Sequence, residues 1–502
     1  MIGYKEIREQ GTNKRLKFLL KDSLLYGSAN AFAKLFSIFT VPILTRLFSK
    51  EEFGVLDGIG IFAALFTPII MMGMNSSIAR FFYETDDEEE QKQIISQGLL
   101  AQLTLGVVIC ISLYITSPEI LTWFFATPQY TPLFRIVVVS IFFSVLVTFS
   151  LNLLKWTFSR TRFLVISLGA TTVSVLLILL YILVFRFGVA GIFLAHLTSN
   201  LFFAILGYFF TRKYLRFPHH LKYISPMLKY GWPFMFVALI FALIPSVDRY
   251  FIINYINLEV LGIYAVGLKI ASILQLPVLG FQTAWGPFAL AIYREKNASE
   301  TYNKIFLYYT ILLTSMALII VLFLKPLIII FASNKYLSAI KVVLPLVFAI
   351  IIDSLSWISG IGIGLSKRTI FNTASYLLTL GTSLISIWLL IKPFGLMGVV
   401  YGILISKIVL TLSKTYFAHK LYSIRFNLKW GIPIVVGGFI SALIIRSVDF
   451  LQWYIQVPIG FGIFIIFVST MWKYFVIDED KKQCLEILKA KFKVKGEVRD
   501  KG

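Results

Sequence analysis

The sequence predicts an all-α polytopic membrane protein with about fourteen transmembrane helices. Apolar residues occupy 58% of its 502 positions and Phe occurs 47 times, and the mean hydropathy is +0.83. Charged residues fall almost entirely between apolar blocks of about 20 residues, the length that crosses a bilayer as a helix. A weak internal repeat also predicts two pseudo-symmetric six-helix lobes followed by two C-terminal helices.

The apolar blocks define the predicted helices in chain order, with short connections between them. Pro42 and Pro245 lie at corresponding points of the first and seventh blocks, where a bend in the helix could help a change of access. The blocks span residues 23–47, 54–74, 93–116, 133–154, 163–185, 188–210, 233–253, 260–282, 305–324, 342–365, 369–391, 395–417, 431–447 and 453–475.

The basic residues predict the orientation of these helices. When the N-terminus is placed in the cytoplasm, inner segments hold about 34 of the 47 Lys and Arg residues and outer loops hold about 7. This asymmetry predicts that both termini are cytoplasmic. The net charge of +22 is therefore explained by inner loops near anionic lipid headgroups, and without a nucleic-acid-binding motif we expect no nucleic-acid partner.

The internal repeat consists of short matches at nearly one offset, about 203–211 residues. Because six helices per copy make the two copies parallel, the repeat predicts a transporter with its substrate path between the lobes. The matches are Tyr26-Gly27 with Tyr230-Gly231, Arg46 with Arg249, Glu51–Gly54 with Glu259–Gly262, Phe82–Glu84 with Tyr293–Glu295, Ser159-Arg160 with Ser366-Lys367, and the Phe-Gly-x-x-Gly turns at 187–191 and 394–398.

The repeat divides the chain into five predicted parts. They are a basic cytoplasmic N-terminal segment (1–22), an N-terminal lobe of helices one to six (23–225), a C-terminal lobe of helices seven to twelve (226–425), the last two helices (426–477) and a basic cytoplasmic tail (478–502).

Three lysines lie near the middle of predicted helices, where a charge costs roughly 2.5–3.5 kcal/mol on insertion scales. Lys34, Lys269 and Lys407 each lie on the polar side of their helix, which predicts a hydrated cationic cavity between the lobes and hence an anionic substrate. The alternatives are a lysine that reaches the interface, as expected for Lys414 near a helix end, or a lysine paired with a buried acid. Asp353 is the one acid at comparable depth and cannot neutralise all three.

The intramembrane acids suggest two further roles. Asp353 is a candidate for energy coupling, with a structural ion pair as the alternative. Asp248 beside Arg249 and Asp57 near Arg46 lie at outer helix ends, where they form either a gate or plain interfacial ion pairs.

Motifs for catalysis are absent from the sequence. It contains no P-loop, no Gly-x-Ser-x-Gly elbow and no zinc-ligand spacing among its four histidines. We therefore expect neither an enzyme nor an ATP-driven pump, and no metal or cofactor. His196 is expected to be a packed polar residue rather than a proton carrier.

Three sequence patterns resemble those of the polysaccharide transporter (Wzx-type) flippases, which belong to a superfamily with lipid II flippases and multidrug and toxin extruders. The patterns are Tyr26-Gly27, the stretch Leu-Thr-Arg-Leu-Phe-Ser-Lys-Glu-Glu-Phe-Gly at 44–54, and the two Phe-Gly-x-x-Gly turns.

This resemblance implies transfer of an undecaprenyl-diphosphate-linked oligosaccharide from the inner to the outer leaflet of the bacterial cytoplasmic membrane. It further implies alternating access driven by an ion gradient or the membrane potential, and membrane lipids, a polysaccharide polymerase and glycosyltransferases as partners. Related lipid flippases keep cavity cations on helices one and eight, which Lys34 and Lys269 match by helix but not by motif. Lys34 is expected to meet the diphosphate.

The resemblance leaves several functions open. A lipid II or teichoic-acid precursor flippase is the nearest alternative, followed by a multidrug exporter of the same fold, although an exporter of cationic drugs should have an acidic cavity. A scramblase or a membrane assembly scaffold without coupled transport is the alternative from a different class.

Overall fold

The computed structural model describes residues 40–293, 295, 297–366, 368–422, 428–448, 453–476, 478 and 481, and these residues form helices without strands. Thirteen helical stretches among them are long and apolar enough to cross a membrane. These stretches correspond in order to the second to fourteenth predicted blocks, which confirms the predicted fold class. Of the first block, residues 40–47 are described, as a helix; Lys34 lies outside the described residues.

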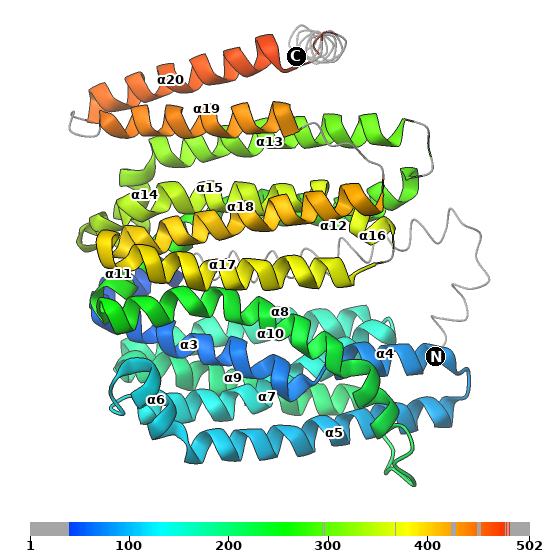
Figure 1. Ribbon diagram of the computed structural model, residues 1–502. Helices are drawn as coiled ribbons and strands as arrows, with labels where there is room; N and C mark the ends of the chain where they lie inside the picture. The colour runs from blue at the N-terminus through cyan, green and yellow to red at the C-terminus, as the bar shows by residue number, and fades with distance from the viewer. Residues whose placement is uncertain are drawn as a thin grey trace, which may run out of the picture.

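The first half of the bundle lies in the lower part of Figure 1. Its helices are α3 (Lys50–Met71), α4 (Met74–Glu84), α5 (Glu88–Ile115), α6 (Ser117–Phe125), α7 (Thr131–Trp156), α8 (Arg160–Leu179) with the π-helical turn η1 (Leu180–Val184), α9 (Gly188–Thr211) and the short turn η2 (Arg212–Tyr214).

The second half follows the same order of long and short helices, with one short helix added. It comprises α10 (Ile224–Tyr255), α11 (Leu258–Ala271), η3 (Ser272–Leu274), α12 (Gln275–Ile292), α13 (Ala298–Leu322), α14 (Leu324–Ala332), η4 (Asn334–Ala339), α15 (Ile340–Ser359), α16 (Ile361–Leu365), α17 (Ile370–Phe394) and α18 (Leu396–Leu421). The added short helix is α16, between α15 and α17. The last two helices, α19 (Leu428–Ser447) and α20 (Trp453–Tyr474), pack against α13 on the side away from the first half (Figure 1).

Capping residues explain where the second helix of each half begins. Ser49 and Glu52 form a capping box, in which the Ser49 side chain accepts from the Glu52 N–H at 3.1 Å and the Ser49 N–H donates to the Glu52 carboxylate at 2.8 Å. Asn257 caps α11 by accepting from the Val260 N–H at 2.8 Å. Because Asn257 follows Ser49 by 208 residues, the repeated sequence around residues 49–54 is a repeated helix start.

Two glycines bring α3 and α11 into backbone contact just after these caps. A Cβ atom at Gly54 would overlap the carbonyl oxygen of Leu258, and one at Gly262 would overlap the carbonyl oxygen of Lys50. The contact is reciprocal, since both Lys50 to Leu258 and Gly54 to Gly262 are offsets of 208 residues. The α3–α11 crossing therefore lies on the pseudo-symmetry axis that relates the halves.

An ion pair marks the end of the bundle at which this crossing lies. Lys50 Nζ is 2.8 Å from Glu259 Oε1. We call this end the Lys50 end (left in Figure 1) and the opposite end, where α4 terminates, the Glu84 end.

Two short helices that the apolar pattern did not predict strengthen the contact at the Lys50 end. They are α6 and α14, nine residues each, beginning 207 residues apart at Ser117 and Leu324. Arg46 Nη2 donates to the carbonyl of Ile330 in α14 at 2.8 Å, and Asn254 Nδ2 in α10 donates to that of Phe124 in α6 at 3.0 Å. The first helix of each half is thus attached to the short helix of the other half.

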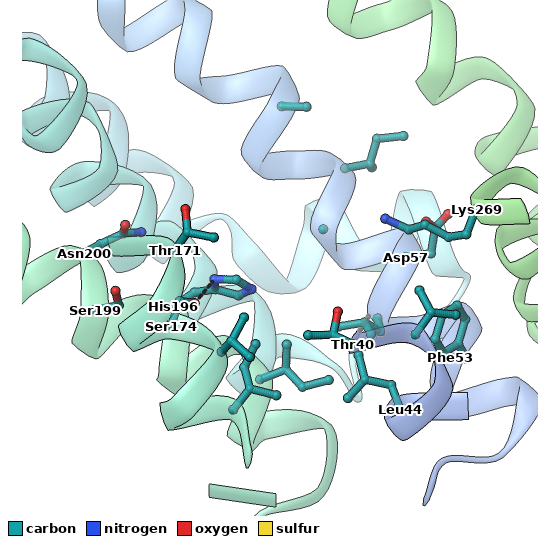
Figure 2. A pocket seen from close by; sticks show the side chains of 18 of the residues that line it. Thr40, Leu44, Phe53, Asp57, Thr171, Ser174, His196, Ser199, Asn200 and Lys269 are labelled. Atoms are coloured by element: carbon teal, nitrogen blue, oxygen red, sulfur yellow. Dashed lines mark hydrogen bonds between the residues drawn. The ribbon is translucent and has the colours of Figure 1, made fainter. Parts of the chain in front are cut away.

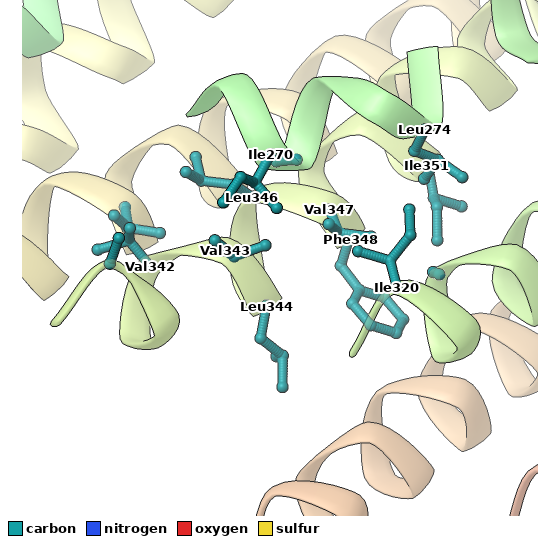
Figure 3. Packing of buried hydrophobic residues seen from close by; sticks show 14 of the residues in the cluster. Ile270, Leu274, Ile320, Val342, Val343, Leu344, Leu346, Val347, Phe348 and Ile351 are labelled. Atoms are coloured by element: carbon teal, nitrogen blue, oxygen red, sulfur yellow. The ribbon is translucent and has the colours of Figure 1, made fainter. Parts of the chain in front are cut away.

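The largest hydrophobic core lies in the second half, around α15. In the span Asn334–Leu365, 78% of the 18-residue apolar segment is buried, the highest fraction among the thirteen spans found in the described residues. Figure 3 shows Val347 and Phe348 of α15 between Ile270 of α11 and Ile320 of α13. Because α15 is enclosed by neighbouring helices, any polar side chain on it must face a cavity or a partner.

We expect Gly262→Ala to lower the free energy of unfolding by about 1–3 kcal/mol, because the new methyl group must displace a backbone carbonyl rather than a side chain. Gly60→Ala on α3 is the matched control, since a Cβ at Gly60 meets no atom within 4 Å. Thermal unfolding of the purified proteins in one detergent measures both. Equal stability of the two variants would contradict the close crossing.

Candidate functional site

A cavity of about 670 Å³ lies between the halves, and we call it the first cavity. Its lining comes from residues 40–44 and from α3, α8, α9, α10 and α11. The charged side chains that line it are Asp57, Arg249 and Lys269, one more cation than anion among the described residues.

The side chains of the first cavity form two different walls (Figure 2). Asp57 and Lys269 lie on one side, and a row of neutral polar groups from α8 and α9 lies on the other. The polar wall is held by hydrogen bonds, including Ser174 Oγ to His196 Nδ1 at 2.9 Å and Asn200 Nδ2 to Ser140 Oγ at 3.1 Å. A ligand with a charged part and a neutral polar part would find a partner on each wall.

Most of this polar wall was not predicted from the sequence. Its residues repeat at helical spacing, because Thr171 and Ser174 are three apart and His196, Ser199 and Asn200 are three and four apart. Residues at these spacings share one helix face, so a search for polar stripes on α8 and α9 could have found them. His196 was expected to be a packed polar residue, but it is exposed; it lines the cavity and forms a hydrogen bond with Ser174.

Arg249 is the centre of an ionic network between α3 and α10. Its Nε is 3.0 Å from Asp57 Oδ2, and its Nη1 is 3.1 Å from Asp248 Oδ2. The same Nη1 donates to the Pro245 carbonyl at 2.9 Å, and Tyr264 of α11 donates its hydroxyl hydrogen to Asp248. The planar guanidinium group serves this arrangement because its several donors point in fixed directions.

The structure differs from the expectation that places Arg46 beside Asp57. Arg46 donates to backbone carbonyls, those of Pro42 and Ile330, both at 2.8 Å, whereas Asp57 binds Arg249. The predicted group of four charged residues is therefore one network of three, together with an arginine that fastens residues 40–47 to α14.

Lys269 lines the first cavity from α11, and its side chain is exposed. It has no carboxylate within ion-pair distance among the residues that the structure describes. Lys269 is thus the cation that gives the first cavity its surplus positive charge. Lys34, predicted to line the same cavity, lies outside the described ranges.

Lys407 lies in a different place from the one predicted. It lines a second cavity of about 420 Å³ in the second half, and its Nζ is 3.1 Å from Asp353 Oδ1. The expectation that Lys407 and Lys269 line one cationic cavity therefore differs from the structure. The reason is that α15 and α18 pack together and bring the single mid-depth acid to this lysine.

Lys414, two helical turns beyond Lys407, is buried rather than interfacial. Only 5% of it is exposed. Its Nζ is 2.8 Å from the Tyr376 hydroxyl and 5.5 Å from the centre of the Trp357 ring. Hydrogen bonding and cation–π attraction replace the solvent that the side chain would have found at the interface.

The chain matches the model of a family described as polysaccharide biosynthesis protein over residues 19–289, more than half of its length. The chain belongs to this family. The resemblance inferred from the sequence is thereby confirmed.

Two relatives of the chain come from Haemophilus influenzae. It is 25% identical over 279 residues to an uncharacterized membrane protein, and the alignment covers 54% of the chain and 65% of that relative. It is 26% identical over 288 residues to Lsg locus putative protein 1, covering 55% of the chain and 67% of that relative. The chain thus spans just under two thirds of the first relative.

Solved structures show that this family member shares its fold with membrane transporters. It superposes on the inward closed conformation of the lipid II flippase MurJ with a TM-score of 0.70 at 18% identity, covering 90% of this chain and 99% of that chain. The inward-facing and outward-facing conformations of a multidrug resistance MATE family transporter give TM-scores of 0.62 and 0.55 at 17% and 18% identity, each covering 80% of this chain and 95% of the other. The protein is thus a multi-pass membrane protein with the fold of these transporters.

We expect Arg249→Ala to destabilise the protein by about 3–5 kcal/mol, because it leaves the buried Asp248 and the partly buried Asp57 without a counter-ion. Asp57→Asn should cost less, since Arg249 keeps Asp248. Lys50→Ala should cost about 1 kcal/mol at most, because its pair with Glu259 is exposed. Thermal unfolding ranks the three variants, and a harmless Arg249→Ala substitution would contradict the network.

Proposed function

We propose that the protein moves a polyprenyl-diphosphate-linked oligosaccharide from the cytoplasmic to the outer leaflet of the bacterial cytoplasmic membrane, for the assembly of surface polysaccharide. The observation that carries the proposal is the first cavity, where Lys269 supplies surplus positive charge opposite a neutral polar wall, in a member of the polysaccharide biosynthesis protein family.

The chemistry of the first cavity suits a diphosphate. A phosphate charge 4 Å from Lys269 gains roughly 4 kcal/mol at an effective dielectric constant of 20, before the cost of desolvation. A lysine ammonium group binds phosphate as a mobile point charge, which favours capture followed by release. Lys34 is the second proposed phosphate ligand, and the polyprenyl chain would stay in the bilayer.

The Lys50 end is proposed to be the closed outer gate of an inward-facing state. The glycine crossing, the Lys50–Glu259 pair and the contacts of α6 and α14 all join the halves at this end. The higher TM-score with the inward-facing MATE conformation than with the outward-facing one supports this assignment. The Asp57–Arg249 pair, which also joins α3 to α10, would open with the gate.

Energy coupling is proposed to use an ion gradient or the membrane potential, which is worth about 2.3 kcal/mol per charge moved through 100 mV. Asp353 stays the coupling candidate. Because its carboxylate is bound to Lys407 in this structure, proton carriage by Asp353 requires this pair to open during the cycle. A polysaccharide polymerase and glycosyltransferases are the proposed protein partners.

The alternative function is transfer of a lipid II or teichoic-acid precursor, which would present the same diphosphate to Lys269. The fold shared with the lipid II flippase MurJ supports this alternative. Direct transfer assays separate the two, because the proposed function predicts faster transfer of the labelled oligosaccharide lipid than of labelled lipid II. The surplus positive charge of the first cavity disfavours cationic drugs. A scramblase would work without a gradient.

In proteoliposomes, we expect Lys269→Ala to slow leaflet transfer of a labelled undecaprenyl-diphosphate oligosaccharide at least about tenfold, because loss of roughly 1.4 kcal/mol of phosphate binding has that effect. Lys269→Arg should retain most of the rate. Lys392→Ala, at an exposed position near the end of α17 and outside both cavities, serves as the matched control. Lys34→Ala tests the residue that the structure does not describe. Wild-type transfer by Lys269→Ala would overturn the proposed role.

The gate proposal has a separate test at the Lys50 end. Lys50→Cys with Glu259→Cys, in a chain whose two native cysteines are replaced by serine, should be joined by a short reversible thiol cross-linker because the native side chains lie 2.8 Å apart. We expect cross-linking to stop transfer and reduction to restore it. Continued transfer by the cross-linked protein would exclude opening at this end.

A further inference from the structure

The second cavity shares a wall with the first. Pro245 and Arg249 of α10 line both cavities, so the two spaces adjoin at this helix. The volume of the second cavity, about 420 Å³, lies within the range of small-molecule sites. A ligand in the first cavity could therefore extend past α10 into the second.

The charges of the second cavity are balanced, unlike those of the first. Its charged lining residues among the described ones are Asp248, Arg249, Asp353 and Lys407, two anions and two cations. Each anion is already paired, with Oδ2 of Asp248 3.1 Å from Arg249 and Oδ1 of Asp353 3.1 Å from Lys407. A diphosphate or a free cation gains little in such a cavity, whereas a neutral hydrogen-bonding ligand keeps both pairs intact.

Much of the remaining lining is aliphatic, and it also includes aromatic rings and amide groups. Trp357 exposes 43% of its surface, and the ring of Tyr376 packs 4.2 Å from that of Phe241. Gln282 lines the same cavity from α12. The rings offer flat apolar faces, and the amide group of Gln282 offers donors and an acceptor.

The Lys407–Asp353 pair completes this set of groups. The side chain of Lys407 is 22% exposed and that of Asp353 is 36% exposed, so both can bind a ligand without separating. An ammonium group donates hydrogen bonds and a carboxylate accepts them. A pyranose ring has the matching features, since its C–H faces are apolar and its hydroxyl groups both donate and accept.

We propose that the second cavity is a subsite for neutral sugar residues of the cargo, with Trp357 beneath a pyranose ring and Gln282, Asp353 and Lys407 on its hydroxyl groups. This inference rests on the proposed function, because it assigns the glycan to the second cavity and the diphosphate to the first. The second half of the protein would then bind the glycan rather than the lipid.

Cysteine protection tests this division with two probes. The first is the neutral oligosaccharide released by mild acid from the lipid-linked pool of the source cells, and the second is farnesyl diphosphate. Gln282→Cys reports on the second cavity and Thr171→Cys on the first, each in the chain without native cysteines. We expect the oligosaccharide to slow maleimide labelling of Gln282→Cys at least about threefold and farnesyl diphosphate to slow that of Thr171→Cys.

The outcomes separate this inference from the proposed function. If the oligosaccharide protects Thr171→Cys alone, the glycan subsite is wrong while the proposed function stands. If neither probe protects either cysteine, both the glycan subsite and the proposed function are wrong.

Trp357→Ala should weaken oligosaccharide binding about tenfold and leave farnesyl diphosphate binding unchanged. Trp472→Ala on α20 is the matched control, and thermal unfolding shows whether each variant is folded. Equal loss for both probes in folded Trp357→Ala would overturn the subsite.

Discussion

The close approach of α3 and α11 at the Lys50 end is the constraint on which the rest of the architecture depends. Only a residue without a side chain allows one backbone to touch another at this distance, and the glycines that permit it are related by the internal repeat. The crossing fixes the halves to each other at one end, so the space between them develops further along the helices. The position of the first cavity follows from this geometry.

Arg249 supplies the electrostatic counterpart of that steric constraint. A guanidinium group that is 14% exposed must recover in hydrogen bonds what it loses in hydration. Its partners are the carboxylate of Asp57 on α3 and, on its own helix α10, the carboxylate of Asp248 and the carbonyl of Pro245. The network therefore joins α3 to α10 through charged groups whose desolvation would be costly without these partners. Such a network favours one arrangement of the halves and resists intermediate ones, which suits a protein with discrete states.

The sequence predicted the long helices because hydrophobicity over 18 or more residues is a strong signal. It did not predict α6 and α14, because nine residues are too few to cross a bilayer and resemble loop ends. Depth in the membrane could be estimated for Asp57 and Asp353, but the direction in which each side chain points could not. Asp57 was therefore assigned to Arg46 instead of Arg249, and Lys407 was placed in the wrong cavity. The stretch at 44–54, one of the patterns that carried the family resemblance, contains the capping box of Ser49 and Glu52. Part of that motif is therefore explained by the start of helix α3.

The single wall of α10 that separates the two cavities has an energetic consequence. A ligand in one cavity would contact Pro245 and Arg249, which line both cavities. A shift of these two residues would change the shape of the other cavity. Thermodynamic linkage makes such an influence equal in both directions. Where both portions of a single molecule favour the same shape of this wall, each strengthens the binding of the other, and the whole cargo is then bound better than the sum of its fragments.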